Sequence, residues 1–225
     1  MELDIRKFLR ETFQITDEEI LRQAEDVGRL EHLKKGALVI ETGERHQTIP
    51  FLIQGVARGF LIDESGHDIS DCFAFRPGEA LMGCGELQAP SAINIEAVTA
   101  CEVLQFPVSM VLTLMEGHPQ ILEVYNRFLR IGLERHWAAK MCMCQYPAMQ
   151  RYQWFLQAYP GLDGIVSSKN IASFLGITPV TLSRLRRDLR EAGTPREFSG
   201  LGKSAGLPAV DAAHHQAQGA ADQTH

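Results

Sequence analysis

The segment 168–187 restricts the fold more than any other part of the chain. Ala172 is small where two helices would cross closely, and Gly176 can adopt the left-handed conformation that ends the first of them. Thr178 can cap a second helix, and Pro179 stands at its first position, where an N–H has no intrahelical partner. Together these constraints predict a helix-turn-helix.

The apolar residues of this segment fall on the sides of the two helices that would face each other. They are Ile171, Leu175, Ile177, Leu182 and Leu185. Their burial leaves an outer face on the second helix that consists of Pro179, Val180, Ser183, Arg184 and Arg187. In a major groove such a face meets base edges and phosphates. The alternative is a helical hairpin whose basic face is only solvated.

Arg184 is the predicted base-reading residue, because a planar guanidinium can bond bidentately to the O6 and N7 of guanine. Arg186, Arg187 and Arg190 are expected at phosphates. The start of the first helix, with its free backbone N–H groups, also suits phosphate contact. The predicted DNA-contacting set is Ser167, Ser168, Lys169, Thr178, Pro179, Val180, Ser183, Arg184, Arg186 and Arg187.

Charge is divided unevenly along the chain. The formal net charge is −6, yet residues 150–203 carry eight basic and four acidic side chains, against 14 basic and 22 acidic ones in residues 1–149. Such a basic segment can attract a polyanion locally. Charge alone fits an ordinary solvated face equally well.

Before this segment the spacing of apolar residues changes from helical to strand-like and back to helical. Residues 2–33 show helical spacing and predict two short helices, the second with a capping box of Thr16 and Glu19. Short β-rich runs separated by turn residues then predict an antiparallel sandwich or roll. The predicted strands are 37–40, 50–53, 56–62, 68–75, 92–98 and 101–106.

Helical spacing returns after Pro107 and predicts a short helix over 109–115, a long one from His118-Pro119 to about residue 145, and another over 148–158. The long helix has a seam at alternating three- and four-residue spacing: Leu122, Tyr125, Leu129, Gly132, His136, Ala139 and Met143. Such a seam packs along another helix, as in a dimer, or lies on the β-roll as part of the core.

This order of elements resembles the cyclic-AMP receptor and fumarate-nitrate regulator (Crp/Fnr) family of bacterial transcription factors. The resemblance covers roughly residues 5–190 and is sharpest over 171–178 and 182–187, with softer matches at 51–55, 63–66 and 77–79. It implies an α+β protein with a jelly-roll type, cyclic-nucleotide-binding-like β-roll sensor domain over 1–117. A connecting and dimerisation helix (118–146), a helix-turn-helix domain (147–200) and a disordered tail (201–225) would follow.

The resemblance also implies a function. The chain would bind double-stranded DNA as a homodimer on a palindromic operator, with half-sites about 34 to 36 Å apart. A small-molecule effector of the roll and RNA polymerase would be its further partners. The long helix would relay the effector signal as a population shift between dimers that can and cannot bind DNA.

Three departures from the family pattern narrow these expectations. Cyclic-nucleotide binders of this family clamp the phosphate with a Gly-Glu-Leu turn and a later arginine, whereas 88–92 after Gly85-Glu86-Leu87 contains no arginine. Cyclic AMP is therefore not the expected effector, and Gly85, Glu86, Leu87 and Ser91 are only candidate pocket residues between roll and long helix. The first cysteine is Cys72, which argues against an N-terminal iron-sulfur cluster. The sequence after Leu189 lacks the alternation of a β-hairpin wing.

Other functions leave no motif in the sequence. We find no phosphate-binding loop, nucleophile elbow or His-Glu-x-x-His, and expect no catalytic residue, metal or cofactor. No apolar run reaches the ~18 to 20 residues of a membrane span, and the N-terminus is charged, which predicts a cytoplasmic protein.

Five cysteines, an odd number, fit reduced thiols. Of Cys142 and Cys144, one is expected to pack and the other to face solvent.

Two alternatives stay open. One is a non-catalytic sensory or protein-binding module whose helix-turn-helix is vestigial. The other is a haem sensor, for which Cys72, Cys84, His67 and His118 are candidate ligands, although none lies in an attachment motif.

Overall fold

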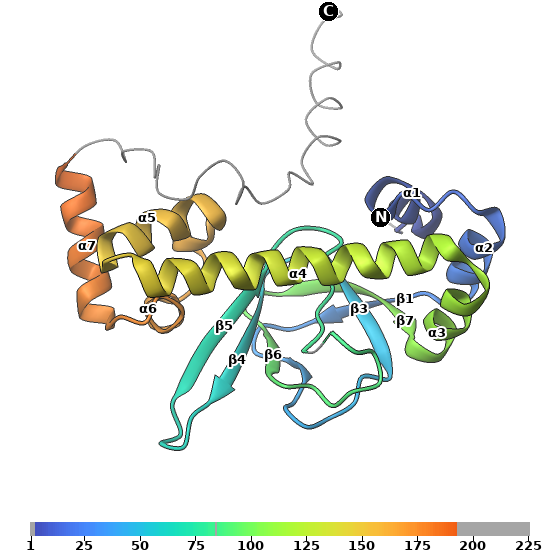
Figure 1. Ribbon diagram of the computed structural model, residues 1–225, viewed down its shortest axis with the longest axis horizontal. Helices are drawn as coiled ribbons and strands as arrows, with labels where there is room; N and C mark the ends of the chain where they lie inside the picture. The colour runs from blue at the N-terminus through green and yellow to red at the C-terminus, as the bar shows by residue number, and fades with distance from the viewer. Residues whose placement is uncertain (1–2, 84, 193–225) are drawn as a thin grey trace, which may run out of the picture.

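The computed structural model describes residues 3–83 and 85–192. Figure 1 shows its arrangement, in which the long helix α4 (Pro119–Gln145) passes over the strands, with the N-terminal helices at one end of it and the last helices at the other. Cys84, the segment after residue 192 where a wing would lie, and the predicted tail 201–225 are outside the described residues.

The two N-terminal helices are α1 (Ile5–Phe13) and α2 (Glu18–Val27). The predicted capping box at Thr16 is wrong: the carboxylate of Asp17 caps α2 by accepting from the backbone N–H of Glu19 at 2.9 Å and of Ile20 at 3.2 Å. The Thr16 backbone N–H donates instead to Gln120 of α4. A carboxylate is a better choice at this position because it also meets the positive end of the helix dipole.

The helical spacing that predicts helix as far as residue 33 is wrong at its end. Residues there form the strand β1 (Arg29–Leu33), which pairs antiparallel with β7 (Cys101–Pro107). Four of the five β1 residues are exposed, and β1 lies at the edge of its sheet. Such a strand lacks the alternation of apolar residues by which strands are recognised.

The predicted β-roll is confirmed. Its other strands are β2 (Leu38–Ile40), β3 (Thr48–Gln54), β4 (Ala57–Ile62), β5 (Asp68–Ala74) and β6 (Asn94–Ala97). They form two antiparallel sheets, with strand orders β1-β7-β3 and β2-β6-β4-β5. Apolar side chains from both sheets make one core, including Leu52, Ile95 and Val103.

The helices after the roll are α3 (Val108–Gly117), α4, α5 (Ala148–Ala158), the short 3-10 turn η1 (Leu162–Gly164), α6 (Ser168–Phe174) and α7 (Pro179–Glu191). The first part of α4 packs on the roll and α1 through aromatic rings: Phe13 lies 4.9 Å from Phe51 and 5.5 Å from Phe128 between centroids. Buried Cys142, in the last turns of α4, belongs to the same core as α5, α6 and α7.

The predicted seam of α4 divides between two environments. Tyr125, Ala139 and Met143 pack against the body of the protein, which confirms the core reading for that side. Two seam residues, Leu122 (42% exposed) and Leu129 (40%), stay outside the body, and with Leu133 (63%) and Trp137 (54%), which the predicted seam did not include, they form an exposed apolar stripe. We call these four residues the α4 stripe.

The cap at Asp17 gives a stability prediction. Replacing Asp17 by alanine should lower the free energy of unfolding by about 1 kcal/mol, because two N–H groups of α2 lose their acceptor. Thr16→Ala is the matched control and should change it far less. Urea unfolding of both variants measures the difference, and equal losses would contradict the assigned cap.

Candidate nucleic-acid interface

The turn between α6 and α7 has the geometry that its sequence predicts. The Ser167 hydroxyl caps α6 by accepting from the Asn170 N–H at 3.2 Å, and Gly176 follows the helix with φ at 62°. The Thr178 hydroxyl caps α7 by accepting from the Thr181 N–H at 3.1 Å, and Pro179 occupies the first position. The local constraints therefore fix how α7 leaves the turn.

The predicted contact between the two helices is also confirmed. Ile171, Ala172, Leu175 and Leu182 have no exposed surface, and Leu185 is 9% exposed. Ile177 is partly buried against the same core. Phe174 extends the contact to α5, where its ring stacks on Trp154 at 6.2 Å between centroids. Since the inner side of α7 is fully used in packing, only its outer side is open to a partner.

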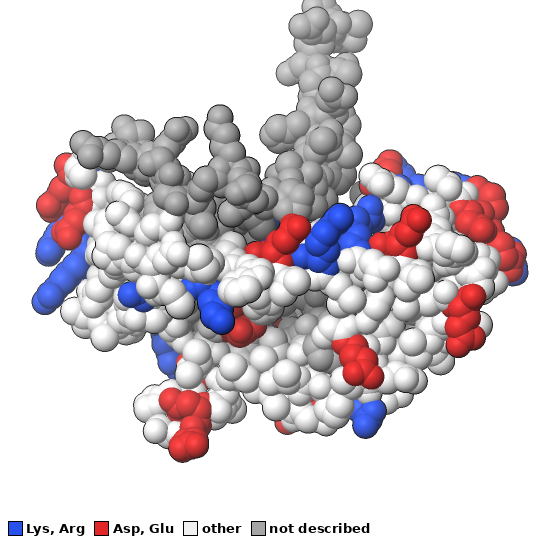
Figure 2. All heavy atoms as spheres, viewed as in Figure 1, with Lys and Arg blue, Asp and Glu red and all other residues white. Residues whose placement is uncertain are grey.

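Five predicted contact residues lie on that outer side and are exposed: Pro179, Val180, Ser183, Arg184 and Arg187. Within the part of the chain that the structure describes, no carboxylate lies within ion-pair distance of Arg184. Arg187 lies near Asp188 at 3.6 Å and Glu191 at 3.9 Å, while 62% of its side chain stays exposed. Figure 2 shows basic side chains projecting outward at the α7 end of the molecule.

Arg186 lies apart from this face. Its guanidinium turns toward Asp163, with Nη2 at 2.7 Å and Nε at 3.1 Å from Oδ1, and Nη1 donates to the Ser168 hydroxyl at 2.6 Å. Partial burial alone would lower the pKa of Arg186, but the bonds to Asp163 hold it above its usual value. Arg186 thus ties α7 to η1 and α6, so two predicted phosphate contacts, Arg186 and Ser168, bind each other here.

The first helix of the pair is fastened to the β-roll. Lys169 pairs with Asp68 of β5 at 3.2 Å. The Ser173 hydroxyl accepts from the Ser70 backbone N–H at 2.9 Å and donates to the Asp68 carbonyl at 3.1 Å. These bonds join α6 to the same strand through side chain and backbone, and we call them the β5–α6 junction.

A buried arginine supports this junction from inside the roll. Arg58 of β4 is 3% exposed and bonds the carboxylates of Asp68 at 3.2 Å and Glu96 at 2.7 Å, and the Ser70 hydroxyl at 3.0 Å. Partial burial alone would raise the pKa of Asp68, but its bonds to Lys169 and Arg58 outweigh this and lower it. Nothing in the sequence marks Arg58, because a lone arginine within an apolar strand has no local motif.

Known proteins resemble this chain in structure but not in sequence. No protein-family model and no curated protein matches the sequence. Solved structures do match. FixK2 from Bradyrhizobium japonicum is 19% identical with a TM-score of 0.68, over 78% of this chain and 90% of that one. A putative Crp/Fnr transcriptional regulator from Eubacterium rectale is 16% identical with a TM-score of 0.63, over 79% of this chain and 85% of that one.

The chain has the Crp/Fnr fold. A third structure of this fold, the cyclic-di-GMP-responsive global regulator CLP of Xanthomonas campestris, is 16% identical with a TM-score of 0.62, over 81% of this chain and 97% of that one. These structural neighbours are regulators rather than enzymes. The α+β architecture expected from the resemblance is confirmed.

The candidate effector turn of this Crp/Fnr fold is tightly held. Ser91 is 2% exposed, and its hydroxyl donates to the Ile93 carbonyl at 2.6 Å. Leu87 is 6% exposed and packs in the core that α4 covers, while the Gly85 carbonyl accepts from the Tyr125 hydroxyl. Glu86 is exposed at the rim. Of the four candidates, Ser91 and Leu87 thus face protein rather than an open site.

Within residues 3–83 and 85–192, the cysteines and histidines lie apart from one another. Cys142 is buried and Cys144 exposed, as the helical spacing predicts, and burial raises the pKa of Cys142 to about 11 and of Cys72 to about 12. His67 lies near Asp63, and His118 near Asp17. Over residues 3–83 and 85–192 no group of three His, Cys, Asp or Glu side chains is placed to hold a metal ion.

None of the helices described there is long and apolar enough to cross a membrane.

The β5–α6 junction generates a pH prediction. Asp68→Asn should lower the free energy of unfolding by about 1 to 3 kcal/mol at pH 7, because Arg58 and Lys169 lose a charged partner. The folded-state pKa of Asp68 lies below its unfolded value of about 3.9, so its contribution is present above that pH and disappears as the pH falls through the folded value. Urea unfolding of wild type and variant should show a constant gap above about pH 5 and a narrowing gap as the pH falls below the unfolded pKa of about 3.9. A gap that does not narrow would contradict the ion pairs.

Proposed function

We propose that this protein is a sequence-specific DNA-binding transcriptional regulator that places α7 in the major groove. The observation that carries the proposal is the outer face of α7, where Arg184 is exposed and unpaired among the described residues on a helix whose inner face is wholly packed. A rigid helix with a free guanidinium is suited to read base edges, because its position is fixed before binding.

The residues of this face and of the helix starts beside it would take three roles. Arg184 would bond guanine, with Ser183 beside it, and the exposed Val180 side chain suits the methyl group of thymine. Arg187, Ser167 and the capped start of α7 at Thr178 would meet phosphates. Arg186 would act as a positioning residue through Asp163 and Ser168 rather than as a contact.

The protein would act as a homodimer through the α4 stripe. Four large apolar side chains lie exposed along one long helix, and an identical stripe on a second copy would cover them by two-fold packing. Because each copy carries one α7, such a dimer would read a palindrome.

The effector of the roll would not be cyclic AMP. No arginine follows the Gly85-Glu86-Leu87 turn over 88–92, and Ser91 and Leu87 are committed to protein contacts. An anionic cyclic phosphate would find no guanidinium from that stretch.

Selection from a randomised duplex pool at fixed moderate salt tests the function. The full chain should enrich a palindrome, and Arg184→Ala should lose about 1 to 3 kcal/mol of binding per half-site and relax the preference at one base pair. Arg190→Ala is the matched control, expected to weaken binding alike on all sequences. Failure to enrich any sequence with or without candidate effectors would favour a sensory or protein-binding module with a vestigial helix-turn-helix.

The dimer has its own test. Leu133→Glu should shift sedimentation from dimer to monomer and weaken binding to the palindrome, because two carboxylates would face each other in an apolar contact. Leu38→Glu, at a leucine 47% exposed on the edge of the roll, is the matched control and should remain dimeric. An unchanged dimer in Leu133→Glu would contradict the α4 stripe as the interface.

A further inference from the structure

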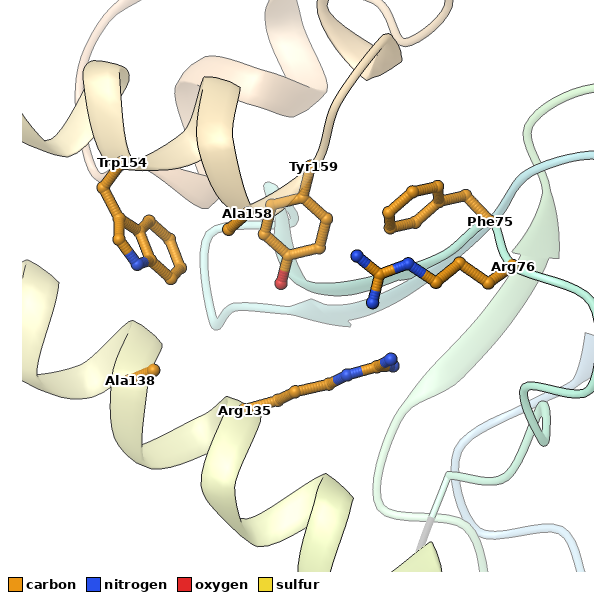
Figure 3. Close-up of a pocket in the computed structure, with 7 residues that line it drawn as sticks. All are labelled: Phe75, Arg76, Arg135, Ala138, Trp154, Ala158 and Tyr159. Atoms are coloured by element: carbon orange, nitrogen blue, oxygen red, sulfur yellow. The ribbon is translucent and has the colours of Figure 1, made fainter. Parts of the chain in front are cut away.

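A small pocket lies where the roll, α4 and α5 meet, away from both the outer face of α7 and the turn at Gly85. It has a volume of about 30 Å³ and is lined by Phe75, Arg76, Arg135, Ala138, Trp154, Ala158 and Tyr159. That space is small, so it can take a compact head group but not a large body. Figure 3 shows the side chains of Arg76 and Arg135 reaching the same space, toward which the Tyr159 hydroxyl also points.

Among the residues that the structure describes, two arginines and no acidic residue line the pocket. Glu79 binds Arg135 at 2.5 Å and accepts from the backbone N–H groups of Phe75 at 2.7 Å and Arg76 at 3.1 Å. Its carboxylate is thereby committed to Arg135 and the backbone. The Arg76 guanidinium lies over the Phe75 ring at 4.8 Å and forms no ion pair with any side chain that the structure describes. The positive charge of Arg76 therefore has no ion-pair partner among the described residues, although Asp71 lies near enough to Tyr159 to help raise its pKa.

The uncharged groups that line the pocket also suit a bound anion. Burial raises the pKa of Tyr159 well above its usual range, so its hydroxyl stays protonated and can donate. The side chains of Phe75, Trp154 and Ala158 form walls that carry no hydrogen-bond acceptor. Donors that converge between apolar walls bind an anion, because a charge-assisted bond is stronger where water is excluded.

We infer that this pocket is a binding site for a small oxyanion, held by Arg76 and Tyr159 and closed on one side by the Glu79-bound Arg135. The chemical class is a phosphate, either free inorganic phosphate or the phosphoryl group of a small metabolite. The inference does not depend on DNA binding, since no residue of α7 takes part.

The two tryptophans, Trp137 and Trp154, allow a site-specific test. In a Trp137→Phe background the only indole left is that of Trp154, which lines the pocket. The full chain is titrated with sodium phosphate and separately with glycerol phosphate, while sodium chloride keeps the ionic strength constant. A saturable change in Trp154 emission is expected. Saturation by phosphate alone assigns the free anion, and tighter saturation by the ester assigns a phosphoryl group on a larger body.

Variants separate this site from other basic surfaces. Arg76→Gln should bind at least about tenfold more weakly, and Arg76→Lys, which keeps the charge but loses the planar fork, should weaken binding less. Lys35→Gln on an exposed turn of the roll and Arg184→Gln on α7 remove the same charge elsewhere and should leave the affinity unchanged. No saturable change with either anion, equal affinity in Arg76→Gln, or loss in Arg184→Gln would overturn the site.

Discussion

The buried guanidinium of Arg58 is the interaction on which the rest of the structure depends. It joins β4 to the carboxylates of Asp68 and Glu96 and to the Ser70 hydroxyl, so it fixes three neighbouring strands by their side chains. A guanidinium that is 3% exposed must be fully paired, because an unpaired buried charge is strongly destabilising. The same Asp68 then pairs with Lys169 of α6. This chain of charges runs from the inside of the roll to the helix-turn-helix, beside the Ser173 hydrogen bonds and the apolar core that the two parts share.

Residues whose roles are local could be predicted from the sequence. Gly176, Thr178 and Pro179 act within one turn of backbone, and the structure places each where its conformational preference requires. The same holds for the strands with apolar alternation and for the bounds of α4. The outer face of α7 could be predicted from its buried face, because burial of Leu182 and Leu185 leaves Arg184 on the exposed side.

Residues whose roles depend on distant partners could not be predicted. Arg186 and Arg187 are adjacent and chemically identical, yet only Arg186 finds Asp163, 23 positions earlier in the chain. β1 is a strand because β7 pairs with it, not because of its own side chains. The pocket at Tyr159 likewise brings together an arginine that follows β5 and one in α4, which no sequence pattern connects.

The β5–α6 junction also bears on how DNA binding would be regulated. Lys169 stands at the start of α6, where a DNA phosphate would lie if α7 occupies the groove, and its ammonium already faces Asp68 at 3.2 Å. Phosphate and Asp68 then compete for one cation, so each bond weakens the other by the same free energy. Whatever shifts β5 changes that competition without touching α7. Arg58 holds Asp68 from the opposite side, so in the proposed regulator the roll would influence DNA affinity through Asp68 and Lys169 rather than through a movement of the whole domain.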